Sequence, residues 1–236
     1  MTKETVLQHL NGHPWAEQLV FLPEVDSTNT YAKNLPHGSC VIADRQSAGR
    51  GRLGRSFVSP AGGLYLSVVL QTEPNFLLTP MAAEAVRRAL CAETGLCPQI
   101  KWVNDLVCDS KKLCGILTEV CGSNVIIGIG LNCCGIPHET ATSLEMLGHR
   151  ADRSRLAAAI IEELFRLWNK SDWLEDYKTN CLTIGRDVQL IQNDTVRYAH
   201  VDDMDHTGAL LVTLSDGTKE RIFSGEVSVR GLYGYV

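Results

Sequence analysis

The sequence has no excess of positive charge and no long hydrophobic run. Lys and Arg number 22 against 27 Asp and Glu, a formal net charge of -5, so no general positive field attracts nucleic acid or acidic membranes. No apolar stretch approaches the roughly 18 residues that a membrane-spanning helix needs. Residues 1–10 also lack the apolar segment of a signal peptide. These absences predict a cytoplasmic protein that neither spans a membrane nor binds DNA.

Motifs for zinc binding and thiol redox chemistry are also missing. Nine cysteines are present, but their number is odd and no C-x-x-C spacing occurs. The seven histidines form no H-E-x-x-H motif. In a reducing compartment such cysteines are expected to be mostly small buried apolar side chains rather than catalytic thiols.

Length and patterning predict one large domain and one small one. The 236 residues are 44% hydrophobic and 21% charged, which is typical of a folded globular chain. Helical spacing and strand-like runs alternate up to about residue 182, and from about residue 183 only short alternating strands remain. In the first part, residues 64–71 predict a strand, and Thr79 as an N-cap before Pro80 predicts a helix that runs to about residue 94 and stops at Gly95. We therefore predict a mixed α+β domain over residues 1–182 and a compact all-β module over residues 183–236.

Residues 45–63 form a polar loop rich in glycine and arginine. Residues 49–54 satisfy G-x-G-x-x-G, but a strand rather than a helix follows the loop, which excludes a Rossmann dinucleotide site. Glycines let the backbone approach a ligand, and arginines attract anions. The arginines of this segment are Arg45, Arg50, Arg52 and Arg55. The loop thus predicts a local anion site, with a solvated surface loop or a nucleic-acid-binding loop as alternatives.

A second group of polar residues surrounds a predicted strand end. Asn104 and Asp105 follow one strand, and Lys111 and Lys112 open a later one. A lysine can neutralise a carboxylate or phosphate, and an aspartate can hold magnesium or orient an attacking amine. On spacing alone, decoration of a hairpin is the favoured role for the two lysines.

Six segments, in order along the chain, resemble motifs of the biotin protein ligase family. They are S-T-N at 27–29, G-R-G-R-x-G-R at 49–55, K-W-x-N-D at 101–105, K-L-x-G-I-L at 112–117, G-I-G-x-N at 128–132 and G-E-V-S at 225–228. The resemblance implies an α+β fold: a mixed-sheet catalytic domain of the biotin/lipoate ligase type, followed by a small SH3-like β-barrel. About 25 residues precede Ser27, which is short for a helix-turn-helix domain, so we expect the form without DNA binding.

The resemblance also implies a two-step activity. Biotin and ATP would form biotinyl-5'-AMP and pyrophosphate, with Mg²⁺ as the metal. The biotinyl group would then pass to one lysine of a biotin carboxyl carrier protein or domain, of acetyl-CoA carboxylase or a related biotin enzyme. Because a carboxylate must attack an anionic phosphate, cations have to gather both anions first. Family members occur as monomers and homodimers, and both states stay open.

Residue roles follow from the same resemblance. Biotin contacts are expected from Ser27, Thr28, Asn29, Gln46, Gly49, Arg50, Gly51, Lys112 and Gly115. Nucleotide contacts are expected from Arg50, Arg52, Arg55, Trp102, Asn104, Lys112 and Asn132. Catalytic roles are expected for Lys112, Arg52 and Asp105, with Asp105 also as the base for the carrier lysine and as a magnesium ligand. A plain helix cap for Ser27 and Thr28, and a core position for Trp102, are the alternatives.

The sequence departs from the family pattern at two positions. Val103 replaces a proline and Phe57 replaces a common tryptophan, but neither change removes a charged group. A lipoate or octanoate ligase is one rival function, although the R-R-x-S-G-G-G pattern of that family is absent. A catalytically silent relative that binds biotin or nucleic acid is the other.

Overall fold

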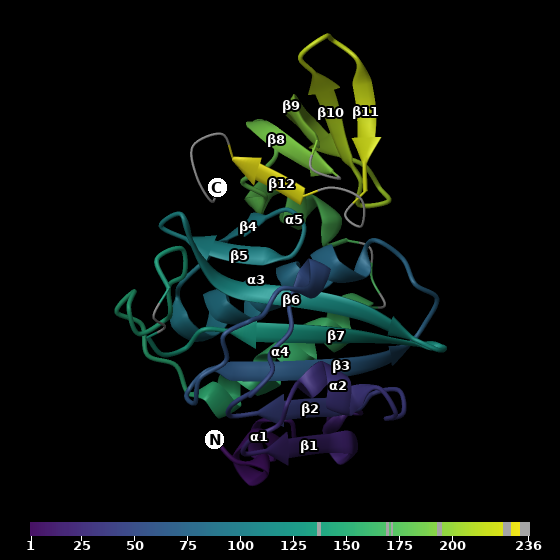
Figure 1. Cartoon of the computed structure of the whole chain (residues 1–236). Helices are drawn as coiled ribbons and strands as arrows, with labels where there is room; N and C mark the ends of the chain where they lie inside the picture. The colour runs from purple at the N-terminus through teal and green to yellow at the C-terminus, as the bar shows by residue number, and fades with distance from the viewer. Residues whose placement is uncertain (136–137, 169, 171, 193–194, 224–227, 232–236) are drawn as a thin grey trace.

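Two β-sheets organise the chain. The computed structural model describes residues 1–135, 138–168, 170, 172–192, 195–223 and 228–231. A seven-stranded mixed sheet packs against helices, and a five-stranded antiparallel sheet lies beside it, at the top of Figure 1. The predicted α+β class, with a mixed sheet followed by a small β module, is confirmed. Within the described ranges, no helix has the length and apolar character needed to cross a membrane.

The larger sheet has the strand order β1-β2-β3-β7-β6-β5-β4. Its strands are β1 (Leu19–Leu22), β2 (Cys40–Ala43), β3 (Leu64–Gln71), β4 (Gln99–Lys101), β5 (Asp105–Cys108), β6 (Lys111–Cys121) and β7 (Asn124–Leu131). Only β1 and β2 pair in parallel, and the other neighbours are antiparallel. The turn between β5 and β6 has Asp109 and Ser110 at φ 48° and 59°, the left-handed geometry of a tight hairpin.

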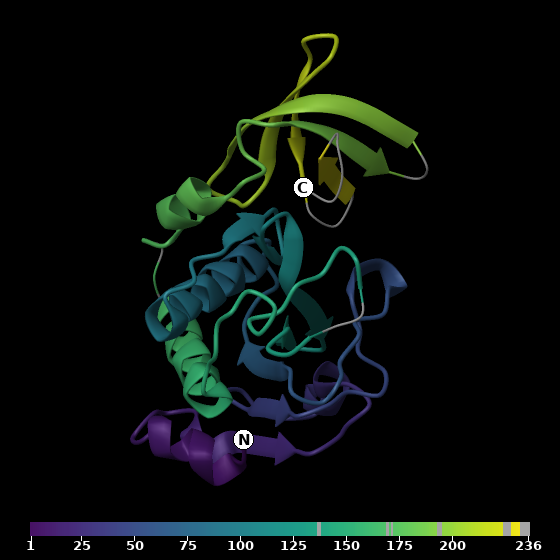
Figure 2. The ribbon, with the colours of Figure 1, turned by 90° about the vertical axis from the view of Figure 1, so that its left-hand side faces the viewer.

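Helices cover the sheet unequally. They are α1 (Lys3–His9), α2 (Thr28–Ala32), α3 (Leu78–Thr94), α4 (Arg153–Trp168) and α5 (Leu174–Asn180). The long helices α3 and α4 lie on one face, whereas the short helix α2 lies on the other (Figure 2). The second face is therefore only partly covered by helices.

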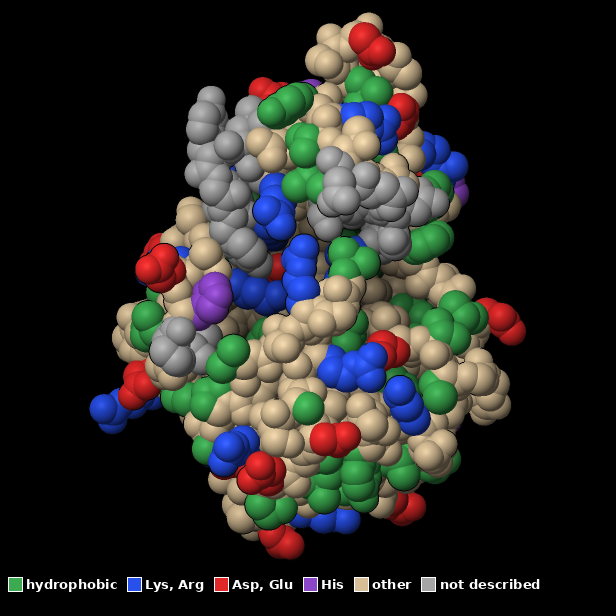
Figure 3. Space-filling model, viewed as in Figure 1, with side chains coloured by type: hydrophobic (Ala, Val, Ile, Leu, Met, Phe, Trp, Pro, Cys, Tyr) green, Lys and Arg blue, Asp and Glu red, His purple; other side chains and the backbone are tan. Residues whose placement is uncertain are grey.

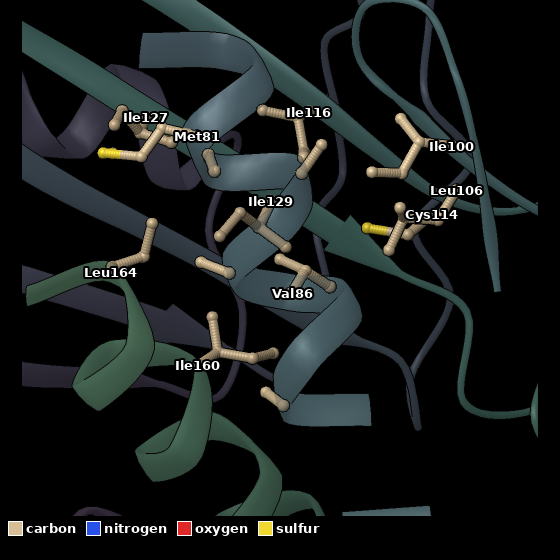
Figure 4. Packing of buried hydrophobic residues seen from close by; sticks show 14 of the residues in the cluster. Met81, Val86, Ile100, Leu106, Cys114, Ile116, Ile127, Ile129, Ile160 and Leu164 are labelled. Carbon is tan, nitrogen blue, oxygen red and sulfur yellow. The ribbon is translucent and has the colours of Figure 1, made fainter. Parts of the chain in front are cut away.

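The main hydrophobic core fills the space between the sheet and the two long helices. Isoleucines of β6 and β7 point toward α3 and α4 (Figure 4). The labelled members on these elements are Cys114, Ile116, Ile127, Ile129, Met81, Val86, Ile160 and Leu164. Because successive strand residues point to opposite faces, Gly115, Leu117, Gly128 and Gly130 face the other way.

A buried group of charges ties α3 to α5. The Glu84 side chain is fully buried, and its carboxylate accepts hydrogen bonds from Arg87 Nε at 2.7 Å and Arg88 Nε at 2.6 Å. Arg88 also pairs with Asp176 of α5. Bonding to Glu84 raises the pKa of Arg87. Since a buried carboxylate is costly unless it is paired, the two arginines offset the cost of burying Glu84.

Two local expectations about α3 need correction. The helix begins at Leu78 without a side-chain cap, because the Thr79 hydroxyl bonds the Thr118 hydroxyl of β6 at 2.8 Å; the capping role predicted for Thr79 is wrong. The end at Gly95, with φ 72°, was predicted. Cys91, in the last turn of α3, and Cys97, just beyond the helix, form a disulfide, so these two cysteines depart from the expected small buried apolar side chains.

The smaller sheet has the order β11-β10-β9-β8-β12. Its strands are β8 (Asp187–Gln192), β9 (Thr195–Met204), β10 (Leu210–Leu214), β11 (Lys219–Ile222) and β12 (Ser228–Gly231). The Trp102 indole N–H donates to the Gly208 carbonyl at 3.2 Å, and Lys178 of α5 pairs with Asp203 of β9 at 3.0 Å. Residues 225–227 of the G-E-V-S motif lie outside the described residues.

Candidate functional site

A cavity lies on the face of the large sheet that α3 and α4 leave uncovered. The space between its walls that no protein atom fills is about 450 Å³, open solvent at the mouth included. Its lining includes Ser27, Thr28, Asn29, Gln46, Arg50, Gly51, Arg52, Phe57, Asn104, Lys112, Gly115, Gly128 and Gly130. Most residues predicted for biotin therefore converge here from α2, the loop of residues 45–63 and strands β6 and β7.

One end of the cavity is a network of neutral polar groups. Gln46 Oε1 accepts from the backbone N–H of Thr28 at 2.8 Å and from its hydroxyl at 3.1 Å. The Ser67 hydroxyl, on β3, lies 2.7 Å from Thr28 Oγ1 and 2.7 Å from Asn29 Oδ1. The hydroxyls of Thr28 and Ser67 have one proton each, yet three oxygen contacts need a proton. One contact therefore lacks a proton, and an oxygen there can accept a hydrogen bond from a ligand N–H group.

The helix-cap alternative for Ser27 and Thr28 does not describe this network. Ser27 occupies the N-cap position of α2, but its side chain makes no capping hydrogen bond. The Thr28 hydroxyl is directed to Gln46 instead. Both side chains are more than nine-tenths buried, so they are available to a ligand in the cavity rather than to solvent.

Three glycines form the floor of the cavity, and a different side chain covers each. A Cβ atom on Gly128 would lie 2.1 Å from Asn29 Oδ1, and one on Gly130 would lie 2.5 Å from the Phe57 ring. A Cβ on Gly115 would lie 2.7 Å from Lys112 Cε. Because real Cβ atoms do not approach other atoms this closely, the covering side chains occupy these positions only over glycine.

The other end of the cavity is charged. Lys112 Nζ lies 2.6 Å from Asp105 Oδ1 and 5.6 Å from the centroid of the Phe57 ring, close enough for a cation–π contact. Asn104 connects the acid to the loop, since its Nδ2 donates to Asp105 at 3.0 Å and its Oδ1 accepts from Arg52 at 3.1 Å. Burial lowers the pKa of Arg52, while Asp105 opposes that change.

Cations from both sheets gather at this end. Burial lowers the pKa of Lys101 to about 8 although Asp105 opposes the change, and Lys112, Arg230 and Arg55 act in the same direction as burial. Arg230 lies on β12 of the smaller sheet. In Figure 3, Lys and Arg side chains gather where the smaller sheet meets the larger one. This concentration of positive charge suits a polyanionic ligand.

Five predicted residues lie outside the cavity lining: Gly49, Arg55, Trp102, Asp105 and Asn132. Asp105 touches the site through Lys112, whereas Trp102 is 4% exposed and packs at the junction of the two sheets. Asn132 is also 4% exposed, and its Nδ2 donates to the Lys112 and Thr142 carbonyls. Asn132 Oδ1 has no hydrogen-bond partner among the described residues.

Three polar residues of the site were missed by the sequence reasoning. Ser67 and Ser59 belong to the network around Gln46, and Glu119 contacts Arg50 and Asn29. A signal existed for Ser67, because it is the single polar residue inside the apolar run of β3. Glu119 gave no such signal, since glutamate in a strand is usually read as a solvent-facing residue.

Two family models match the chain. The model described as the Biotin/lipoate A/B protein ligase family matches residues 21–133, and the Biotin protein ligase C terminal domain matches residues 183–230. Among curated proteins, the bifunctional ligase/repressor BirA of Escherichia coli is 31% identical over 260 residues, covering 98% of this chain and 78% of that protein. The biotin--[acetyl-CoA-carboxylase] ligase of Mycobacterium tuberculosis is 34% identical over 178 residues, covering 65% of this chain and 64% of that protein.

Solved structures agree with these matches. The biotin protein ligase of Aquifex aeolicus in complex with biotin and ATP aligns with a TM-score of 0.83 and 31% identity, covering 91% of this chain and 99% of that one. The biotin protein ligase of Leishmania major in complex with biotinyl-5-AMP aligns with a TM-score of 0.61 and 27% identity, covering 88% and 99%.

Proposed function

Because this chain belongs to the biotin/lipoate A/B protein ligase family and is a biotin protein ligase, we propose that the cavity described above carries both half-reactions. Biotin and ATP form biotinyl-5'-AMP, and a lysine of a biotin carrier protein then accepts the biotinyl group. The arrangement that supports this most directly is one cavity with a neutral polar end and, at its other end, the ion pair of Lys112 and Asp105.

The neutral end receives the ureido ring of biotin. Its N–H groups complete the proton-deficient network of Thr28, Ser67 and Asn29, and Ser27 and Gln46 border the same space. Lipoate and octanoate have no N–H donor at the corresponding end, so they would leave buried polar groups unpaired, which is costly. This comparison favours biotin over the two rival acids.

The charged end brings the two anions together. Lys112 contacts the biotin carboxylate and the bridging phosphate oxygen, while Arg52 holds the adenylate and Arg55 adds positive charge. In this role the cations offset the repulsion between a carboxylate and the α-phosphate. The backbone of Gly49, Arg50 and Gly51 lets the loop lie close over the ligand, and Gly115 leaves room for the Lys112 stem.

Magnesium fits this site as an ion that arrives with the nucleotide. Within the described residues no group of three or more His, Cys, Asp or Glu side chains could hold a metal by itself. The donor set is the Asp105 carboxylate, and one carboxylate together with phosphate oxygens is a usual arrangement for Mg²⁺. The bound ion would neutralise phosphate charge.

The second half-reaction needs a base. Asp105 accepts a proton from the ε-amine of the carrier lysine, and Asn104 keeps the carboxylate in place through its 3.0 Å hydrogen bond.

For the nucleotide, the unpartnered Oδ1 of Asn132 suits the exocyclic amine of adenine. Trp102 lies at the junction of the two sheets, where its indole N–H bonds the Gly208 carbonyl, so its contact with the nucleotide would be made at that junction.

Exchange of labelled pyrophosphate into ATP tests the first half-reaction without the carrier. We expect exchange with biotin, and a kcat/KM for lipoate or octanoate lower by about 10⁴-fold, as for sites built to hydrogen-bond the missing group. Faster exchange with lipoate or octanoate than with biotin would assign the enzyme to those acids. Absence of exchange with all three, in folded protein, would leave the silent relative as the correct reading.

Replacement of Arg52 by glycine is expected to speed the release of biotinyl-5'-AMP by about 10–100-fold, because hydrogen bonds to charged groups are lost. The measurement is the decay of purified enzyme-bound adenylate by rapid filtration. Arg45→Gly is the matched control, since Arg45 lies at the start of the same loop and makes an exposed pair with Glu24. Equal decay in Arg52→Gly and wild type would remove the clamping role.

The remaining assignments concern the carrier protein, the compartment, the oligomeric state and the domain boundary. The carrier is a biotin carboxyl carrier domain of acetyl-CoA carboxylase or a related biotin enzyme, and the ligase works in the cytoplasm as a monomer or homodimer. The net charge of -5 supports a ligase that does not bind DNA. We place the domain boundary between residues 182 and 183, because Leu182 still bonds Ile100 of β4 and the smaller sheet starts at Asp187.

A further inference from the structure

Glu119 lies just outside the cavity, on the same face of β6 as two residues that line it. Strand alternation places Gly115, Leu117 and Glu119 on one side, whereas Ile116 faces the core and Thr118 bonds Thr79 of α3. The Glu119 side chain is 19% exposed. It does not line the cavity, so any effect on the ligand must pass through a neighbour.

The two carboxylate oxygens of Glu119 bind two different parts of the site. Oε1 lies 3.1 Å from a guanidinium nitrogen of Arg50, on the loop of residues 45–63. Oε2 accepts from Asn29 Nδ2 at 2.8 Å. That bond fixes the orientation of the Asn29 amide, since its Oδ1 must then face Ser67. The Glu119 carboxylate therefore connects the glycine-rich loop to the neutral polar network.

The tip of this loop contacts the sheet through side chains, among them Arg50, Arg52 and Phe57. The tip is a small hairpin in which Gly51 N–H donates to the Arg55 carbonyl at 2.7 Å and Phe57 N–H to the Gly49 carbonyl at 2.9 Å. Among side chains, Arg50 reaches Glu119 and Arg52 reaches Asn104. A glycine-rich segment loses much conformational entropy when it is ordered, so each attachment influences how often the loop is closed.

We propose that Glu119 is a positioning residue: it holds the loop of residues 45–63 closed through Arg50 and orients Asn29 toward the ligand. This inference rests on the proposed function of the cavity. Glu119 acts before biotin binds, by raising the fraction of molecules with a closed loop. Once biotin is bound, the ligand itself keeps the loop closed, and Glu119 no longer affects the chemical step.

Two substitutions separate the roles of charge and hydrogen bonding. Glu119→Gln removes the charge that attracts Arg50 but keeps an oxygen acceptor, so the KM for biotin in pyrophosphate exchange should rise about 3–10-fold. Glu119→Ala removes both contacts and should raise KM about 10–50-fold. In both variants kcat at saturating biotin should stay within about 2-fold of wild type, because the closed state is then populated by ligand.

Trypsin reports on the loop independently of activity, since the loop contains four arginines. Both variants should be cleaved in residues 45–63 faster than wild type without biotin, and saturating biotin should reduce that difference. Higher salt should speed cleavage of wild type and leave Glu119→Gln unaffected, since salt screens a partly exposed ion pair. Glu24→Gln, which breaks the exposed pair with Arg45 in the same loop, is the control and should match wild type.

Unchanged KM for biotin, or unchanged trypsin cleavage, in both folded variants would overturn the proposal. A fall in kcat without a change in KM would also overturn it, because that result would place Glu119 in the chemical step. Absence of exchange in the wild type would instead contradict the proposed function, and the trypsin comparison would still test the contact between Glu119 and the loop.

Discussion

Substitution of Lys112 by alanine is expected to lower kcat for biotin-dependent pyrophosphate exchange by about 10²–10³-fold, the usual cost of removing one group that stabilises charge in a transition state. Lys112 Nζ lies 2.6 Å from Asp105. Its removal takes away a cation and also leaves Asp105 to repel the incoming triphosphate. The loss should therefore appear in the adenylation step itself, measured under saturating biotin and ATP.

Lys111→Ala is the matched control for this experiment. Lys111 precedes Lys112 on β6 but is exposed, and alternation points its side chain to the other face of the strand. We expect exchange at the wild-type rate in Lys111→Ala. Lys112→Arg should recover only part of the activity, since a planar guanidinium does not replace a compact ammonium group. Wild-type exchange in Lys112→Ala would show that the charge is supplied elsewhere.

Substitution of Glu84 by glutamine is expected to lower the free energy of unfolding by about 3–5 kcal/mol, since it leaves two arginines without their buried partner. Glu84 is fully buried between Arg87 and Arg88, and the glutamine has the same shape. The measurement is the shift of the urea midpoint, followed by circular dichroism, at constant denaturant dependence.

Glu163→Gln tests whether burial causes this effect. Glu163 pairs with Arg166 on α4 with the same i,i+3 spacing, at 2.6 Å, but the two side chains are 26% and 39% exposed. A pair of this kind is worth about 0–1 kcal/mol, so we expect a small change in stability. An equal decrease in the free energy of unfolding in both variants would show that burial of Glu84 does not cause the effect.

The sequence predicted the elements whose patterns are strong and local. The apolar run of β3 and the glycine that ends α3 were both identified correctly. The helix α5 was missed, because Leu174–Asn180 is mostly polar and buries only Tyr177. The start of α3 was misplaced because Thr79 has a tertiary partner, Thr118, and no local pattern reveals that choice.

The candidate site was predicted from motifs, so residues that belong to no motif were not found. Residues such as Gln46, Arg50 and Lys112 were named from the resemblance and do meet in one cavity. Glu119 and Ser67 join the site only because β3 and β6 are both neighbours of β7. Contacts of this kind depend on strand order and register, which a single sequence does not specify.

The glycine floor also determines how the cavity could be reshaped. Gly115, Gly128 and Gly130 have no side chain to shorten, so extra room cannot be made from below. It can come only from the side chains above them, and Phe57 is the one of these without a charge or an amide. Substitutions at Phe57 and Gly130 are consequently coupled: a smaller residue at one position is the condition for a larger one at the other. A ligase redesigned for a bulkier biotin analogue would therefore begin at Phe57.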